Sequence, residues 1–451
     1  MARIAFAGLS HLGIVSSIAA AAKGFDVVGF DSDEALCASL NQGCFPIVES
    51  GLPELLAANR GRIRFVSDPQ MLSGCDVIVC SADVPTDASG ASELSRIRQL
   101  LDIVTSRASV EAALVVLSQV PPGFTRQLAG SLAERRTDRS PSVFYQVETL
   151  IFGRAVERAL HPERFIIGCD DPNRPLPSAY AALLALFDCP VLRMRYESAE
   201  LAKLSINLFL VSSVTTANAL AEVCEAIGAD WSEIAPALRL DARIGQHAYV
   251  QPGLGISGGN LERDLATVQA LAERHGTDAG IVSAWRADSR YRRDWVLRKL
   301  HATVLSKHQA PSIAMWGLAY KPGTHSTKNS PSIALLEALG RCGVNIYDPQ
   351  AVLPAGTTPA AIQAGSALEA CREADALVVM VPWPEFSTVS LAHIRELMRG
   401  DVIIDPFSVL DRARCAELGF RHLRLGARAT VGKPPTAFSS TQSRVSVSSA
   451  E

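Results

Sequence analysis

Short apolar segments recur along the first third of the chain, and segments with helical periodicity separate them. Residues 4–7, 27–30, 77–80 and 114–117 are apolar throughout and do not alternate with polar residues. A strand of this kind is buried on both faces, as in a parallel sheet that helices cover on either side. The pattern therefore predicts βαβ units and a doubly wound α/β domain.

The same pattern returns in the last third of the chain. Apolar segments at residues 312–317, 344–348, 376–381 and 402–405 again alternate with helical stretches. No short-period repeat links the two parts, so we expect a second, separate Rossmann-like fold.

One long helix is predicted between these two parts, over residues 198–227. Ser198 is a suitable N-cap, and Gly228 stands just past the end. About thirty residues at 1.5 Å each span roughly 45 Å, which suits a connector between lobes or a dimer spine.

These patterns divide the chain into four parts. We predict an N-terminal Rossmann domain at residues 1–195, a helical middle and dimerisation domain at 196–300, and a C-terminal Rossmann-like domain at 301–435. Residues 436–451 are rich in Ser and have no periodicity, so we expect a disordered tail.

Length, net charge, apolar content and cysteine spacing indicate the broad class of protein. The 451 residues allow two or three domains, and a net charge of -3 gives no electrostatic reason to expect nucleic acid. We expect no apolar run long enough for a bilayer, and the N-terminus lacks a signal-peptide layout. The ten cysteines form no CxxC pair, which favours reduced thiols in the cytoplasm and no metal site.

Residues 8–13 read Gly-Leu-Ser-His-Leu-Gly, directly after the first predicted strand and at the start of a helix. This is the dinucleotide-binding turn of a Rossmann fold, with Ser10 where the second Gly normally stands. Gly8 would form the tight turn and Gly13 would allow close helix packing. Asp31 ends the next strand at a spacing suited to a ribose diol, and an acidic residue there favours NAD over NADP.

Residues 253–264 read Gly-Leu-Gly-Ile-Ser-Gly-Gly-Asn-Leu-Glu-Arg-Asp. This segment resembles the active-site loop of the UDP-glucose/GDP-mannose dehydrogenase family, Gly-x-Gly-Phe-Gly-Gly-Ser-Cys-Phe-x-Lys-Asp. In that family the Cys is the covalent nucleophile, and its position here is Asn260. Segments 43–54, 84–95, 118–121, 148–168, 317–332, 347–349 and 383–386 resemble further family motifs in the same order.

This resemblance implies an NAD-dependent dehydrogenase of a nucleotide-activated sugar, similar to UDP-glucose 6-dehydrogenase. A UDP-sugar substrate, a role in polysaccharide precursor biosynthesis and a homodimer are implied with it. The N-terminal domain at residues 1–195 would bind NAD, and the C-terminal domain at 301–435 would bind the nucleotide sugar. Leu12, Val84 and Gln119 would join the turn in binding the cofactor. The implied substrate-binding residues are Arg243, which reaches into the neighbouring subunit, Tyr249, Gly253, Gly255 and Lys321.

Lys203 and Asn207 lie four residues apart on the long helix and share one face with Asn218. A solvated stripe and a substrate-facing row both fit this spacing. The resemblance implies that Lys203, Asn207 and Asp264 bind and activate a water and stabilise a developing oxyanion. Glu148 would position this water or transfer protons.

Several positions depart from the family pattern. Asn260 cannot form the thioester through which the family completes a second oxidation. Gln119 replaces a Thr, Phe152 replaces a second Glu, and residues 405–408 read Asp-Pro-Phe-Ser where Asp-Gly-Arg-Asn is usual. We therefore expect a single two-electron oxidation that releases an aldehyde or ketone, although a gem-diol formed from water allows a second one.

Two other functions fit parts of the sequence. A non-catalytic regulatory subunit that binds NAD or a nucleotide sugar would explain the missing Cys. A 2-hydroxy acid dehydrogenase on a related three-domain plan would not explain the C-terminal Rossmann-like half.

Overall fold

The computed structural model of the chain describes residues 2–86, 92–135, 141–257, 260–340, 342–358 and 360–431. The predicted tail at 436–451 lies outside the described residues. Two compact units divide the chain: one comprises the residues up to 213 together with 256–288, and the other comprises 214–255 and the residues from 289 onward. The finer division at residues 195, 300 and 435 stays a prediction.

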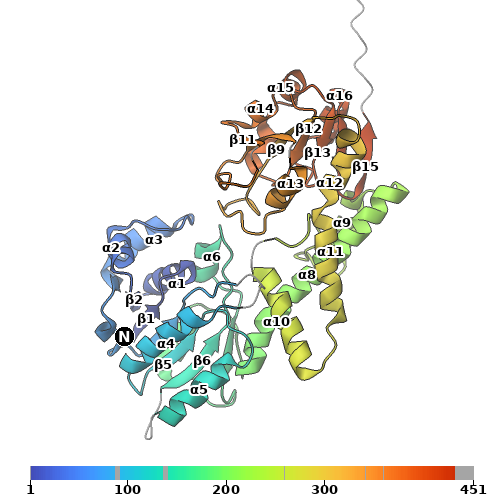
Figure 1. The fold of residues 1–451 in the computed structure, drawn as a ribbon. Coiled ribbons are helices and arrows are strands. Elements are labelled where there is room, and N and C mark those ends of the chain that lie inside the picture. The colour runs from blue at the N-terminus through green and yellow to red at the C-terminus, as the bar shows by residue number, and fades with distance from the viewer. Residues whose placement is uncertain are drawn as a thin grey trace, which may run out of the picture. The chain divides into compact units, whose positions relative to one another are not determined.

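The first unit contains a sheet with the strand order β3-β2-β1-β4-β5-β6-β7-β8, in which only the β6–β7 pair is antiparallel among the described strands. Figure 1 labels β1, β2, β5 and β6 of this sheet. Its strands are β1 (Arg3–Ala7), β2 (Asp26–Phe30), β3 (Ile63–Val66), β4 (Val77–Cys80), β5 (Ala113–Val116), β6 (Ser142–Gln146), β7 (Phe165–Cys169) and β8 (Val191–Arg195). Its helices before the long one are α1 (His11–Ala22), α2 (Glu34–Gln42), α3 (Leu52–Asn59), α4 (Ser95–Arg107), α5 (Phe124–Arg135), α6 (Ala155–Leu160) and α7 (Ser178–Ala185).

Alternate residues of each central strand enter two separate hydrophobic cores. Phe6 and Val79 pack with α1, whereas Ala7 and Cys80 pack with α4. Because both faces are covered, every residue of β4 and β5 is buried. This explains why these strands are apolar throughout.

The second unit contains a sheet with the order β11-β10-β9-β12-β13-β14-β15, parallel except for the β14–β15 pair. Its strands are β9 (Ser312–Trp316), β10 (Gly343–Tyr347), β11 (Ala361–Gln363), β12 (Ala376–Val379), β13 (Val402–Ile404), β14 (Arg421–Arg424) and β15 (Ala427–Val431). The helices that pack with this sheet include α13 (Pro331–Leu339), α14 (Ala367–Ala370), α15 (Leu391–Leu397) and α16 (Arg412–Glu417). The predicted α/β class, with two Rossmann-like doubly wound domains and helices between them, is confirmed.

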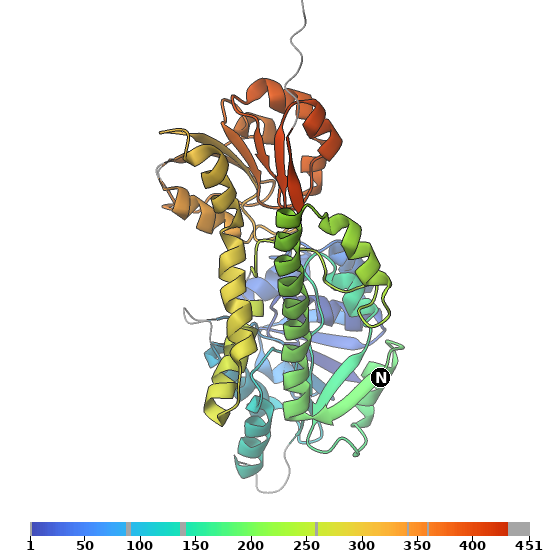
Figure 2. The ribbon, with the colours of Figure 1, turned by 90° about the vertical axis from the view of Figure 1, so that its right-hand side faces the viewer.

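The long helix is α8 (Tyr196–Ile227), drawn in green in Figure 2. It begins at Tyr196, directly after β8, so the prediction that Ser198 is its N-cap is wrong. Tyr196 is buried and its hydroxyl donates to the Val143 carbonyl at 2.8 Å, which fixes this residue in place two positions before the predicted start. The predicted end is confirmed, since Gly228 has φ +86° and its N–H donates to the Cys224 carbonyl at 3.0 Å.

By length and composition, α8 is also apolar enough to cross a membrane, since an 18-residue window within it has a mean hydropathy of 1.4. This corrects the expectation that no apolar segment is long enough. A helix inside a folded domain meets the same criterion, and α8 carries Lys203, Asn207 and Asn218. Composition alone therefore does not assign α8 to a bilayer.

The remaining helices are α9 (Trp231–Leu240), α10 (Asn260–His275), α11 (Gly280–Arg293) and α12 (Trp295–Leu300). In the first unit, Leu265 of α10 and Val282 of α11 pack around Val211 of α8. This small core fixes the face of α10 that carries Asp264 relative to α8.

Candidate active site

The turn between β1 and α1 needs glycine at two positions. Gly8 has φ +88°, and a Cβ there would lie 2.8 Å from the Ala82 backbone nitrogen. A Cβ on Gly13 would lie 2.1 Å from the Gly8 carbonyl oxygen. The turn therefore brings the chain close to itself and leaves the N-terminus of α1 uncovered by side chains at these positions, as a diphosphate requires.

Ser10 occupies the middle position of this turn without blocking it. It caps α1 from an extended conformation, and its hydroxyl donates to the Ser81 carbonyl at 2.6 Å. The side chain thus turns toward the end of β4. Leu12 follows on α1 and lines a pocket beneath that helix.

Asp31 directly follows β2 and is 7% exposed. Its carboxylate accepts the Leu9 N–H at 2.8 Å and the Asp33 N–H at 3.1 Å. A carboxylate has about four acceptor sites, so Asp31 keeps capacity for a ribose diol.

Asp348 directly follows β10, at the corresponding place in the second sheet. It accepts from four backbone N–H groups and from the Trp383 indole. These five donors fill its acceptor sites, so Asp348 holds its own turn together. The residues of the first sheet therefore fit NAD better than those of the second.

An ion pair joins α8 to the segment after β6. The Lys203 Nζ lies 3.1 Å from Glu148 Oε2 and 3.1 Å from the Glu148 carbonyl oxygen. The two side chains are 14% and 18% exposed. Glu148 Oε1 accepts the Leu150 N–H, so the carboxylate is fixed from both sides.

Asp264 lies on α10 and is 1% exposed. Its Oδ1 accepts from the Gln119 Nε2 at 2.7 Å and from the Arg263 Nε at 3.3 Å, and its Oδ2 accepts from the Asn207 amide. Burial raises the pKa of the Asp264 carboxyl, while Arg263, Asn207 and Gln119 oppose the rise because they stabilise the ionised form.

Asn260 is the first residue of α10 and is exposed. It stands one helical turn before Asp264, so their Cβ atoms lie on the same side of the helix. Gly258 and Gly259, which precede it in the loop, lie outside the described residues.

The predicted substrate residues belong to the second unit. The Gly253 N–H donates to the Asn218 Oδ1 at 2.8 Å, so the wholly buried Asn218 holds this loop. Gly255 has φ +81°, and a Cβ there would lie 2.4 Å from the Ser289 carbonyl oxygen.

Arg243, Tyr249 and Lys321 complete this predicted set. The Arg243 side chain is 89% exposed and pairs with Asp241, two residues away. Tyr249 is half exposed, and Lys321 is half-buried after β9, with its Nζ 5.7 Å from the centroid of the Tyr320 ring.

Sequence reasoning misses two further groups, of which Arg263 is the first. It bridges three segments, donating to the Val84 carbonyl at 3.0 Å, to Gln119 and to Asp264. Its position in the family's loop motif is the available signal, because the motif has Lys there.

Glu49 is the second such group, and its side chain is 1% exposed. It accepts from the His11 Nε2 at 2.8 Å, the Gly153 N–H at 2.9 Å and the Ala155 N–H at 3.2 Å. His11 begins α1, and its ring lies 4.3 Å from that of Phe152. Glu49 thus ties the dinucleotide turn to the segment that carries Glu148.

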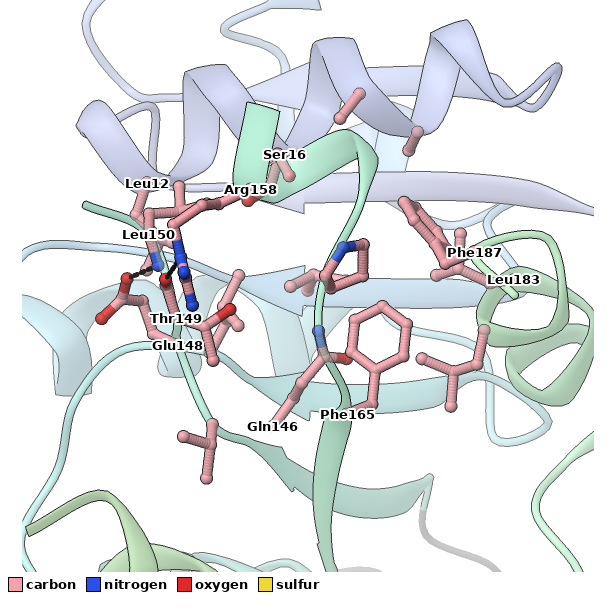
Figure 3. Close-up of a pocket in the computed structure, with 18 of the residues that line it drawn as sticks. Leu12, Ser16, Gln146, Glu148, Thr149, Leu150, Arg158, Phe165, Leu183 and Phe187 are labelled. Atoms are coloured by element: carbon pink, nitrogen blue, oxygen red, sulfur yellow. Dashed lines mark hydrogen bonds between the residues drawn. The ribbon is translucent and has the colours of Figure 1, made fainter. Parts of the chain in front are cut away.

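The pocket beneath α1 adjoins the same segment (Figure 3). In that view Glu148 and Leu150 lie toward one end and Leu183 and Phe187 toward the other. Within the described ranges, no group of three or more His, Cys, Asp or Glu could hold a metal ion.

Comparison with known proteins finds one and the same family along the chain up to residue 412. Residues 2–187, 197–288 and 314–412 match the models of the NAD binding, central and UDP binding domains of the UDP-glucose/GDP-mannose dehydrogenase family. A UDP-glucose 6-dehydrogenase of Rhizobium meliloti (strain 1021) is 28% identical over 434 residues, which cover 94% of this chain and 99% of the relative.

Two solved structures are similar over nearly the whole chain. A UDP-glucose dehydrogenase from Pyrobaculum islandicum has a TM-score of 0.83 at 25% identity, covering 95% of this chain and 98% of its own. A UDP-D-ManNAc dehydrogenase from Pyrococcus horikoshii has a TM-score of 0.80 at 25% identity, covering 94% and 99%.

Proposed function

The chain belongs to the UDP-glucose/GDP-mannose dehydrogenase family and is an NAD-dependent nucleotide-sugar dehydrogenase, and from this premise we propose that it oxidises a UDP-sugar at C6 in one two-electron step. The observation that carries the proposal is Asn260. A carboxamide does not add to an aldehyde as a thiolate does, so no thioester forms at this position.

The residues retained in the first unit suit the first oxidation. Bound NAD supplies the acceptor for a hydride, and Gly8, Ser10, Gly13 and Asp31 would hold it. Oxidation of an alcohol also releases a proton and develops negative charge on oxygen. The Lys203 ammonium can stabilise that charge, and Glu148, 3.1 Å away, can accept the proton.

The identity of the sugar is also proposed from the relatives. Relatives named for UDP-glucose and for UDP-D-ManNAc are equally identical to this chain, at 25%. We take UDP-glucose as the first substrate to test because the Rhizobium relative is also named for it. Lys321, Gly253, Gly255 and Tyr249 would contact the substrate, and the product would serve polysaccharide precursor biosynthesis.

We further propose that the protein forms a homodimer. One face of α8 exposes apolar side chains at helical spacing: Phe209 is 78%, Leu220 46%, Val223 50% and Ile227 72% exposed. Arg243 projects into solvent beside Asp241, as expected of a residue that completes a neighbouring site. We expect Phe209→Asp to produce a monomer in light scattering and to lower activity, and a dimer of unchanged affinity would contradict this.

The predicted cytoplasmic location belongs to the proposal as well. All ten cysteines are free thiols, and Cys44 alone among them is exposed rather than buried or half-buried. Free thiols in this number are usual in a reducing compartment.

The deciding experiment measures NADH formed per sugar nucleotide consumed, over a panel of UDP-, GDP- and dTDP-sugars. A ratio of one supports a single oxidation. A ratio of two means that a gem-diol replaces the thioester and overturns the single-step proposal. No turnover on any sugar, with tight binding of both ligands, favours the second candidate, a non-catalytic binding subunit, which the loss of the thiol at position 260 also suits.

Position 260 itself provides a matched pair of variants. Asn260→Cys restores a thiol and should move the ratio from one toward two. Asn260→Ser introduces a side chain similar in size to Cys but without a thiol, and it should leave the ratio at one.

A further inference from the structure

Both carboxylate oxygens of Asp264 already accept hydrogen bonds from protein groups, which does not suit a carboxylate that must exchange protons with a substrate. Gln119 and Arg263 donate to its Oδ1, and Asn207 donates to its Oδ2. With 1% of the residue exposed, these donors replace nearly all of its hydration.

Arg263 uses each of its three nitrogens on a different acceptor. Nε donates to Asp264 at 3.3 Å, Nη1 to the Val84 carbonyl at 3.0 Å, and Nη2 to Gln119 Oε1. The planar guanidinium fixes these directions relative to one another. A lysine has one nitrogen and could not reach all three acceptors.

Gln119 completes the arrangement because both ends of its amide are used. Its Oε1 accepts from Arg263 and its Nε2 donates to Asp264 at 2.7 Å. The cation on one side and the anion on the other select a single orientation of the amide. A threonine hydroxyl at this position is too short to bridge both partners.

The Lys203–Glu148 pair shares no hydrogen bond with this network within the described residues, although the Lys203 charge also opposes the rise in the pKa of Asp264. Lys203 Nζ has both of its short contacts with Glu148, at 3.1 Å each, whereas the donors to Asp264 are Gln119, Arg263 and Asn207. The two carboxylates of the site therefore have different partners and different surroundings. Glu148 is 18% exposed at its side chain and Asp264 is almost wholly enclosed.

We propose that Gln119 and Arg263 are a matched pair of positioning residues that hold Asp264 as a fixed acceptor, so that proton transfer falls to the Lys203–Glu148 pair. The inference rests on the proposed dehydrogenase function. In the reaction the substrate O–H bond breaks and its proton passes to Glu148, while Asp264 stays ionised and anchors α10, where Asn260 stands. Each residue of the pair needs the other, because each supplies the partner that the other lacks.

A double-mutant cycle tests the pair. Gln119→Thr, Arg263→Lys and the double variant are compared with the unchanged protein, and the exposed pair Gln70→Thr and Arg107→Lys serves as the matched control. We expect each single variant to lower kcat about tenfold and the double variant to lower it about tenfold as well, because either change already opens the network. The controls should keep kcat within about twofold. A loss of about a hundredfold in the double variant would show two independent residues and overturn the proposal.

The pH profile separates positioning from a general structural role. Gln119→Thr removes a donor that favours ionised Asp264, so the acid limb of kcat should move to higher pH. Glu148→Gln should instead lower kcat at every pH. An unmoved acid limb in Gln119→Thr, with reduced stability alone, would contradict the positioning role.

The same four proteins are also unfolded in urea without cofactor or substrate. The losses in the unfolding equilibrium constant should again be non-additive, by about tenfold or more. This measurement does not depend on turnover. If no sugar nucleotide is oxidised, the proposed function fails, while additive losses in urea would overturn the pair on their own.

Discussion

The buried carboxylate of Glu49 should hold the segment that carries Glu148 against the dinucleotide turn. Glu49→Ala would leave the His11 ring nitrogen and the N–H groups of Gly153 and Ala155 without their acceptor. An unsatisfied buried donor costs about 1–3 kcal/mol. Of these donors the Ala155 N–H is buried, the His11 ring is half-buried and Gly153 is exposed, so the first two predict a loss of about 2–4 kcal/mol in the free energy of unfolding.

Urea unfolding measures this loss directly. Glu49→Gln keeps one oxygen but turns an NH2 group toward an N–H donor, so it should lie between Glu49→Ala and the unchanged protein. Glu54→Ala is the matched control, because Glu54 is exposed on α3, and it should cost less than about 1 kcal/mol.

Activity provides a second readout of the same contacts. Loosening residues 151–155 displaces Glu148, so kcat should fall more than the affinity for NAD. A Glu49→Ala protein with stability within about 1 kcal/mol of the original, and with kcat unchanged, would refute the reasoning. The N–H groups of Gly153 and Ala155 would then find water as readily as the carboxylate.

Three further predictions concern other parts of the structure. Gly13→Ala places a Cβ 2.1 Å from a carbonyl oxygen and should markedly lower NAD affinity by calorimetry, whereas Gly130→Ala, with no heavy atom within 4 Å, should leave it unchanged. Asp31→Ala should weaken NAD binding with little loss in the free energy of unfolding. Asp348→Ala leaves five donors without an acceptor, so it should lower the free energy of unfolding in urea by at least about 3 kcal/mol and leave NAD affinity unchanged. A larger loss of stability in Asp31→Ala than in Asp348→Ala would contradict this. Burial raises the pKa of Glu200 above its ordinary 4.5, so the native state holds this proton more tightly and the free energy of unfolding falls as pH rises from 4.5 through the raised value. Glu200→Gln should flatten that fall, and parallel curves would contradict it.

The central strands can be predicted from the sequence because they are buried on both faces and are therefore apolar throughout. The central strands β1, β4 and β5 match the predicted ranges within about a residue on that basis. The start of α8 escapes prediction because Tyr196 enters the helix through packing against Val143, a contact over a long sequence separation. Such a contact leaves no signal in local propensity.

Asp31 and Asp348 show why the candidate site could be predicted only in part from the sequence. Both directly follow their strands, and only the hydrogen bonds distinguish a carboxylate with free acceptor sites from one that is filled. Arg263 and Gln119 are 144 residues apart, so periodicity and spacing could not bring them together. Gln119 can be recognised from the sequence as a departure from the motif, but not as the partner of Arg263.

The pattern of departures favours an enzyme over a binding subunit. In the proposed reaction Asn260 would affect only the chemistry after the aldehyde has formed, whereas Lys203 and Glu148 would serve the formation of that aldehyde. A partly buried ion pair is costly to desolvate, and replacement by apolar residues is often neutral or stabilising. A protein that only bound its ligands would gain little from holding an ammonium and a carboxylate 3.1 Å apart at 14% and 18% exposure. That arrangement is of use where charge develops on an oxygen and a proton must leave, which is the first oxidation of an alcohol.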